Sequence, residues 1–245
     1  MQTTYLNKIK EISPSYYPWF SYHVEPLFDY HNPWEETEEI NYKLNNVGLR
    51  CDDFNKIEDP ESHIVFAGCE FTIPMDVKYE DGWAYKIHNE FYKDKCNFIN
   101  ISYAGVDSDR LIYNILKYIN LYGKPSKLFI LMPELIRAYG WWPEAKGFKP
   151  KMYRQHSGGT EHNLMAEPHD LPVQLLALKY IQSITILNQY CKDTGIDLTW
   201  TSWDSQTNEF LEQYNFNGFF KIDSRKDFDQ NYVYESFKQR IEKKI

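Results

Sequence analysis

The feature that most constrains the fold of this chain is a regular alternation of two sequence patterns from residue 63 onward. Short runs rich in β-branched and aromatic residues favour buried strands, and the longer stretches between them repeat apolar residues every three or four positions, which favours amphipathic helices. Leu111, Ile115 and Ile119, for example, share one face of a stretch that Gly123 ends. We expect strands at 63–67, 97–102, 127–132, 196–201 and 218–223, and helices at 83–92, 108–122, 172–191 and 232–243.

Strands that alternate with helices at this spacing form βαβ units, in which helices cover both faces of a parallel sheet. Because crossover connections are right-handed, few arrangements remain. We therefore expect an α/β fold: a flavodoxin-like three-layer domain with a five-stranded parallel sheet in the order 2-1-3-4-5. Ligands of such sheets bind at the carboxyl ends of the strands. The first candidates for a site are residues 68–70, 103–105, 133–134, 202–204 and 223 onward, which follow the five strands.

Residues 1–45 differ in composition from the rest of the chain. Prolines at 14, 18, 26 and 33 are interspersed with many of the 42 aromatic residues (7 Trp, 20 Tyr and 15 Phe). Prolines this close together exclude a regular helix, whereas the density of rings argues against a disordered tail. We expect an irregular N-terminal arm over 1–45 that lies on its own α/β domain, 46–245, or on another protein subunit.

A second addition to the α/β pattern is an insertion at 133–171, between the third strand and the longest helix. It is too long for a simple turn, and loops of this length are typical of lids and contact surfaces. The rings of Trp141 and Trp142 offer flat faces for a glycan, but we favour the alternative that they dock the insertion onto its own domain or a neighbouring subunit.

Three further residues complete the set of candidate ligand-binding residues, and the spacing of the histidines bears on whether they could bind a metal. His156 and His162 lie in the insertion, and Trp203 follows the fourth strand. The gaps that separate His156, His162 and His169 match no helical pair of metal ligands. We therefore expect no metal site and no cofactor.

The charge balance and the apolar runs exclude other classes of partner. The chain has 35 acidic and 27 basic residues, a formal net charge of −8, whereas a nucleic-acid clamp needs a basic face. No apolar run reaches the roughly 18 residues of a membrane span, and the first residues lack the apolar core of a signal peptide. The four cysteines form no CxxC pair and fit reduced, buried thiols. We expect neither nucleic acid nor membrane as a partner, and a protein made in the cytoplasm, with a virion as a possible later destination.

Two blocks near the start of the alternating pattern resemble a known family. The run 44–50 (Leu-Asn-Asn-Val-Gly-Leu-Arg), an acidic turn and then 64–72 (Ile-Val-Phe-Ala-Gly-Cys-Glu-Phe-Thr) are similar to the N-x-x-G-x-R and strand-G-D-S-x-T opening of SGNH (GDSL-type) esterases. The resemblance is in particular to the GDSL-like proteins of marine phages, whose first block often reads Gly-Cys-Ser. It spans roughly residues 41–245 and implies an SGNH-type fold.

The resemblance also implies where an active member would keep its chemistry. Such an enzyme needs a Ser nucleophile, a His base, and an oxyanion hole of backbone N–H groups with an Asn side chain. The equivalent positions here are Glu70 for the nucleophile, Gly105 for a backbone donor, and Glu134 where Asn is expected. The last block, normally Asp-x-x-His, reads from Asp227 to Gln230, and Gln has no nitrogen that titrates near neutral pH. The resemblance thus implies the loss of both nucleophile and base.

Our leading hypothesis is a catalytically degenerate SGNH-hydrolase-like domain that acts as a binding or assembly protein, for example in a phage virion. The arm 1–45 and the insertion 133–171 would contact other protein subunits, and a glycan is a second candidate partner.

Two enzymatic hypotheses stand beside it. The first is an active SGNH-type esterase or deacylase on acylated carbohydrate, with a shifted site built from Ser102, Ser157 or Ser202 and a histidine of the insertion. The second is a glycosidase whose general acid and base are strand-end carboxylates, with Glu70 and Glu134 as the first pair to consider.

Overall fold

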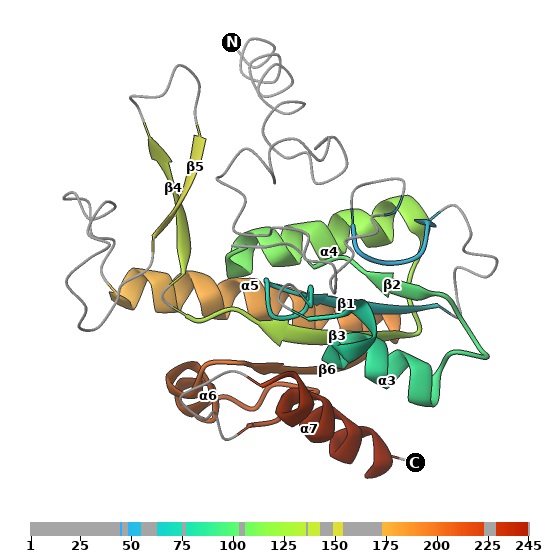
Figure 1. Cartoon of the computed structure of the whole chain (residues 1–245). Helices are drawn as coiled ribbons and strands as arrows, with labels where there is room; N and C mark the ends of the chain where they lie inside the picture. Colours follow the sequence, from blue (N-terminus) through green and yellow to red (C-terminus); the bar gives the residue numbers. More distant parts are fainter. Residues whose placement is uncertain are drawn as a thin grey trace.

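The structure is a computed structural model of the whole chain, shown in Figure 1. It describes residues 45, 49–54, 63–74, 77–102, 106–135, 137–142, 149–153, 173–222 and 229–244. The expected N-terminal arm therefore lies outside the described residues, apart from Asn45 at its end.

A four-stranded parallel sheet forms the centre of the described part (Figure 1). Its strands are β1 (Ile64–Gly68), β2 (Phe98–Asn100), β3 (Lys127–Met132) and β6 (Asp197–Ser202). They are ordered β2-β1-β3-β6, with every neighbouring pair parallel. The predicted α/β class is confirmed, and so is the order of the first four predicted strands.

The prediction of a fifth strand at 218–223 is wrong. Only one isolated parallel bridge, between Phe219 and Trp200, joins this segment to β6. Trp200 donates its N–H to the Gly218 carbonyl (3.0 Å) and accepts from the N–H of Phe220 (3.0 Å). Gly218 has a φ of 72°, a left-handed conformation that an extended ladder does not contain. The chain therefore turns onto β6 at one point, and the pairing goes no further.

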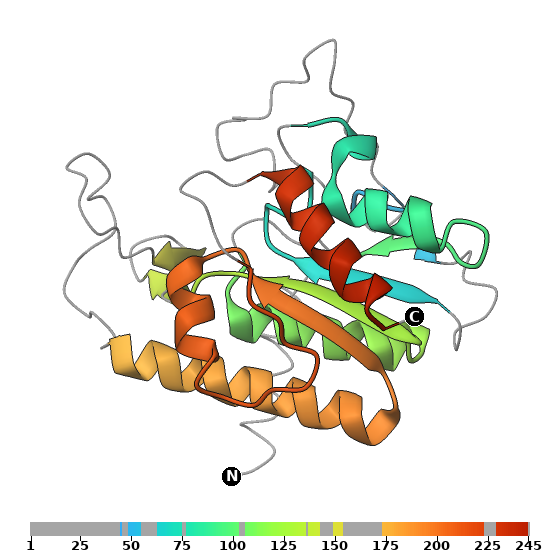
Figure 2. The same cartoon turned by 90° about the horizontal axis from the view of Figure 1, so that it is seen from below.

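Helices cover both faces of the sheet. They are α3 (Trp83–Phe91), α4 (Ser108–Tyr122), α5 (Val173–Thr194), α6 (Ser205–Leu211) and α7 (Gln230–Glu242), with a short 3₁₀ turn, η2 (Tyr79–Asp81). Figure 2 shows α3 and α7 side by side on one face, with α4 and α5 on the other. The four predicted long helices are present, and α6 was not predicted.

Aspartates begin three of these helices. The side chains of Asp107, Asp204 and Asp229 each accept a hydrogen bond from a backbone N–H in the first turn of α4, α6 and α7. Such caps satisfy donors that have no partner within the helix, and each contributes about 1 kcal/mol.

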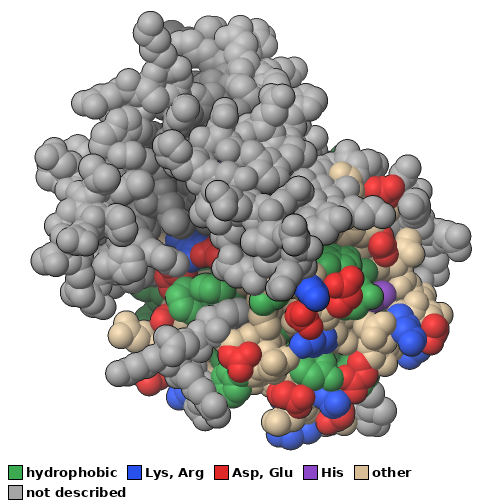
Figure 3. Space-filling view, in the orientation of Figure 1, with side chains coloured by type: hydrophobic (Ala, Val, Ile, Leu, Met, Phe, Trp, Pro, Cys, Tyr) green, Lys and Arg blue, Asp and Glu red, His purple; other side chains and the backbone are tan. Residues whose placement is uncertain are grey.

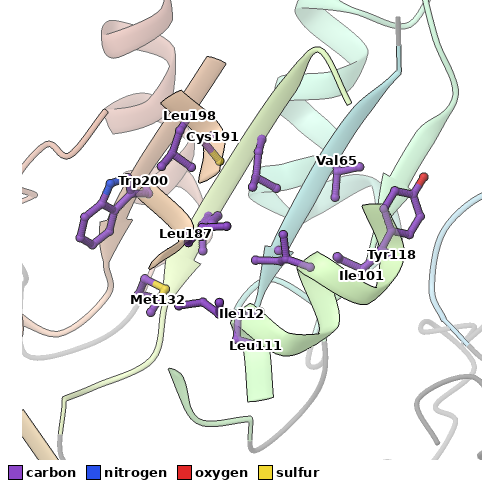
Figure 4. Packing of buried hydrophobic residues seen from close by; sticks show 14 of the residues in the cluster. Val65, Ile101, Leu111, Ile112, Tyr118, Met132, Leu187, Cys191, Leu198 and Trp200 are labelled. Atoms are coloured by element: carbon purple, nitrogen blue, oxygen red, sulfur yellow. The ribbon is translucent and has the colours of Figure 1, made fainter. Parts of the chain in front are cut away.

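The core has two parts, one on each face of the sheet, because side chains alternate along each strand. Val65 and Ala67 of β1 belong to the cluster packed against α4 and α5, which Figure 4 shows in part. Ile64 and Phe66 belong to the cluster on the other face. The fully buried ring of Trp83 in α3 stacks on Phe237 of α7 in that second cluster, with centroids 4.4 Å apart.

The insertion contributes an antiparallel hairpin that extends away from the sheet (Figure 1). Its strands are β4 (Ala138–Trp142) and β5 (Lys149–Tyr153), and the backbones of Trp141 and Trp142 pair with Pro150 and Lys149. No helix in the described part of the chain combines the length and the apolar character needed to span a bilayer.

Candidate functional site

Glu70 and Glu134, from two different strand ends, meet at one arginine. Glu70 lies just beyond β1 and Glu134 just beyond β3, and these two strands are neighbours in the sheet. Their carboxyl ends therefore face the same edge, as the parallel topology requires. Arg137, three residues after Glu134, lies between the two carboxylates.

Arg137 binds Glu70 through two parallel hydrogen bonds. Its Nη1 donates to Oε2 (2.7 Å) and its Nη2 to Oε1 (2.6 Å), the bidentate arrangement that suits guanidinium and carboxylate best. Nη2 also lies 2.9 Å from Oε2 of Glu134. The Arg137 side chain is 0% exposed, Glu134 6% and Glu70 20%, so the cluster is buried with one carboxylate reaching the surface.

Burial and charge act in opposite directions on these groups. Burial alone would lower the pKa of Arg137, but its hydrogen bonds to Glu70 and the nearby acidic groups raise that pKa above its ordinary value. Burial, followed by the charge of Glu70, raises the pKa of the neighbouring Cys69 thiol. Arg137 is therefore a permanent cation, and Cys69 is a neutral thiol, not a nucleophilic thiolate.

The loop that carries Glu134 and Arg137 is fixed by hydrogen bonds to α5 and α6. Tyr180 of α5 donates to the carbonyl of Pro133 (3.1 Å). The N–H of Leu135 donates to Oγ1 of Thr207 in α6 (2.9 Å), and that hydroxyl in turn donates to Asp204 (2.6 Å). These bonds hold the loop in one conformation, so the position of Arg137 is set by the surrounding helices.

Gln230, for which the sequence resemblance implies the position of the base, joins three segments. Its Nε2 donates to the carbonyl of Phe71 (3.0 Å), and its Oε1 accepts from the backbone N–H of Trp83 (2.9 Å). The amide thus connects the start of α7 to the loop after β1 and to the start of α3. Its position near the site was predicted, and the structure gives it a structural role.

Trp203 and Phe71 form an aromatic pair beside this amide. Their ring centroids are 4.6 Å apart in an edge-to-face arrangement, and Trp203 is partly buried. Trp203 was predicted to bind a ligand, and the contact that the structure gives it is with its own domain.

Two of the serines proposed for a shifted site, Ser102 and Ser202, have no histidine partner in the described part of the chain, and Ser157 lies outside the described residues. Ser202 is fully buried and donates to the carbonyl of Met132 (3.2 Å). Ser102 is 1% exposed, and its hydroxyl has no hydrogen-bond partner among the described residues. The described histidines are His63, which precedes β1 at the opposite edge of the sheet, and His88 in α3.

Several predicted site residues fall outside what the structure describes. Gly105, Asp227, His156 and His162 are among them. For Trp141 and Trp142 only the backbone, in β4, is described. Among the described residues, no three His, Cys, Asp or Glu side chains are grouped as metal ligands would be.

Arg137 is the site residue that sequence reasoning missed. The signal was present, because two glutamates were predicted at adjacent strand ends and burying them there requires a cation. Arg137 is the only arginine within ten residues of Glu134 on its C-terminal side. We found no family model and no curated protein that matches the chain.

Proposed function

We propose that this chain is a catalytically inactive domain of the SGNH type, with a flavodoxin-like sheet, that functions in binding or assembly. The observation that carries the proposal is the bidentate ion pair between Glu70 and Arg137. Glu70 holds the position that corresponds to the nucleophile, and a guanidinium occupies both of its oxygens.

The ion pair opposes ester hydrolysis in two ways. A carboxylate whose two oxygens accept charge-assisted hydrogen bonds is a poor nucleophile, because attack would break both bonds in a buried setting. The two Nη groups of Arg137, which would otherwise be good donors to an oxyanion, are already bound to Glu70 and Glu134. Both oxygens of Glu70 and both Nη groups of Arg137 are engaged within the cluster, which is the arrangement of a structural ion pair.

The base position supports the same conclusion. Gln230 uses its amide nitrogen and its amide oxygen in hydrogen bonds within the domain. It has neither a titratable nitrogen nor a free acceptor with which to take a proton from a nucleophile.

The carboxylate pair is also poorly suited to glycoside hydrolysis. A general acid must hold a proton at working pH, which requires an environment that favours the neutral carboxyl. Both oxygens of Glu70 instead accept hydrogen bonds from the buried Arg137, and Glu134 lies 2.9 Å from the same cation, so the two carboxylates are bound within their own domain.

A role in binding would account for the high content of aromatic residues, because those rings would form contact surfaces. We propose that the ring-rich arm 1–45 and the insertion 133–171 contact other protein subunits, with a phage virion as one such assembly. The hairpin β4–β5 supports this, because its backbone extends away from the sheet (Figure 1). A glycan is a second candidate partner for the insertion.

Activity-based labelling tests the proposal that the domain has no hydrolase activity. The purified protein is treated with a fluorophosphonate probe and assayed on p-nitrophenyl acetate and acetylated sugars, beside Glu70→Ala and an active serine esterase. We expect no labelling, and turnover equal to that of Glu70→Ala. A labelled serine, or turnover well above that variant, would refute the proposal and favour the esterase with a shifted site.

A further inference from the structure

The outward face of α5 carries large apolar side chains. Leu175, Leu178 and Ile186 are 37%, 52% and 59% exposed, although the opposite face of the same helix is buried in the core. The three residues lie on one side of the helix, since their spacings of three and eight residues are close to whole turns. We call these three residues the apolar strip, which the exposed Gln182 interrupts. Exposed apolar side chains gathered on one helix face are typical of a contact site.

The same face has almost no charge. Within 173–191 the only charged residue is Lys179, whereas α7 carries Glu235, Lys238, Arg240 and Glu242 in a shorter helix. Figure 3 shows charged side chains of both signs over the described surface on the α3 and α7 side of the molecule. One residue in four of this chain is charged, so a stretch of this length would carry four or five charges if it faced only water.

The strip is arranged symmetrically about Gln182. Leu178 lies four residues before it and Ile186 four residues after it, and Gln182 itself is exposed. When two identical helices pack antiparallel around a two-fold axis, a residue before the axis meets residues at the same distance after it on the partner. A second copy of α5 therefore places Leu178 of each copy near Ile186 of the other, and Leu175 near Gln189.

The charges beside the strip also fit a second copy. Lys179 and Ser183, four residues apart, lie on the same side of α5, and Ser183 donates a hydrogen bond to Asp109 of α4. Lys179 makes no ion pair with any residue that the structure describes. A two-fold axis near Gln182 brings the Lys179 of each copy toward the Asp109 of the other, so the two opposite-charge pairs lie along the same edge of the contact, symmetrically placed about the axis.

We propose that two copies of this chain pair through the outward faces of α5, antiparallel about a two-fold axis at Gln182. The helix has 22 residues and is about 33 Å long, enough for a continuous helix–helix contact across the domain. This pairing uses the opposite side of α5 from the core and does not depend on the state of the strand-end site.

Mass measurement tests the pairing. Sedimentation or light scattering of the full chain, up to about 100 μM, is expected to give twice the monomer mass of 29.4 kDa. Ile186→Asp and Leu178→Asp place like charges in the strip and are expected to return the mass to that of the monomer, with unchanged circular dichroism. A wild-type chain that stays monomeric, or variants that remain dimeric, would overturn the proposal.

Cysteine cross-linking tests the axis itself. Gln182→Cys places a thiol at the two-fold axis, so oxidation is expected to give a covalent dimer. Gln189→Cys is the matched control, because its thiol lies seven residues from the axis and its copy roughly 21 Å away. Equal cross-linking of the two variants would overturn the proposed register.

Charge reversal tests the opposite-charge pairs. Lys179→Asp is expected to weaken the dimer at least tenfold, and adding Asp109→Lys is expected to restore most of the loss. Failure of the second change to restore the dimer, while the single variants remain folded, would overturn the predicted contact between Lys179 and Asp109.

Discussion

Replacing Arg137 by methionine is the sharpest test of the site described here. The substitution keeps most of the side-chain volume and removes the cation that Glu70 and Glu134 share. It leaves two carboxylates, one of them 6% exposed, facing each other without a counter-charge. Bonds to Tyr180 and Thr207 fix the backbone on both sides of Glu134, so the loop itself does not move this carboxylate toward solvent.

The expected cost follows from the burial of the cluster. Removing one partner of a buried ion pair typically lowers the free energy of unfolding by about 3–5 kcal/mol, because an uncompensated charge remains. The Arg137 side chain is 0% exposed, so solvent does little to reduce this cost. For a domain of this size, a loss of that magnitude lowers the unfolding temperature by roughly 6–20 °C.

Chemical and thermal unfolding followed by circular dichroism measure the loss, with two matched variants. Arg110→Met removes a partly exposed arginine of α4 and is expected to change stability by about 0.5 kcal/mol or less. Arg137→Met combined with Glu70→Gln and Glu134→Gln removes all three charges together. It is expected to regain at least about 2 kcal/mol over the single variant, since no buried charge is then left alone.

Two results would refute this reasoning. A loss below about 1 kcal/mol in Arg137→Met would mean that the carboxylates do not depend on this cation. A triple variant no more stable than the single one would mean that packing around Arg137, and not its charge, accounts for the effect.

Three further predictions concern α3 and the contacts it makes. Gln230→Ala removes the hydrogen bonds to Phe71 and Trp83 and is expected to cost about 1–3 kcal/mol in urea unfolding, whereas an unchanged midpoint would contradict the structural role of this amide. Burial lowers the pKa of His88 despite its bond to the Cys96 carbonyl, so the unfolded chain binds protons more readily. The free energy of unfolding is therefore expected to decrease as the pH is lowered through 6.5, by at most about 1.4 kcal/mol per pH unit. The decrease is expected to be smaller in His88→Gln, and an equal dependence on pH in the two proteins would count against a lowered pKa of His88. Trp83→Ala empties a fully buried position stacked on α7 and is expected to cost about 3–5 kcal/mol by the same measurement, against a loss under about 1 kcal/mol if the ring were dispensable.

Periodicity was sufficient to predict the elements that bury a full face. The strands that became β1 and β3 are mostly apolar and buried, and in β6 Leu198 and Trp200 alternate with polar residues. The stripe of α4 lies where the spacing of Leu111, Ile115 and Ile119 placed it. The segment 218–223 also contains apolar and aromatic residues, but it does not form a strand of the sheet. The run begins with Gly218 in a left-handed conformation and is bridged to β6 only at Phe219, and composition reveals neither that conformation nor the extent of the pairing.

Only the part of the candidate site that follows from the topology of the sheet could be predicted from the sequence. Parallel strands bring the residues that follow them to one edge, and this placed Glu70 and Glu134 near each other before any contact was known. The partner that joins them, Arg137, lies in the loop after β3, where the conformation depends on hydrogen bonds to α5 and α6. Side-chain pairing inside such a loop is a tertiary property, so residue types could suggest a cation there but not which one.

The ion pair also explains why the proposed loss of catalysis would be difficult to reverse. Glu70→Ser with Gln230→His would restore the residue types of an SGNH-type hydrolase at both positions. The serine would take from Arg137 its bidentate partner and leave the buried guanidinium with Glu134 alone, while the histidine would lose the bonds that join α7 to Phe71 and Trp83. Glu134 would then lie beside any oxyanion formed at the serine, and the like charges would oppose the reaction. We therefore expect each single change to lower stability, so packing at this end of the sheet favours keeping Glu70 and Gln230.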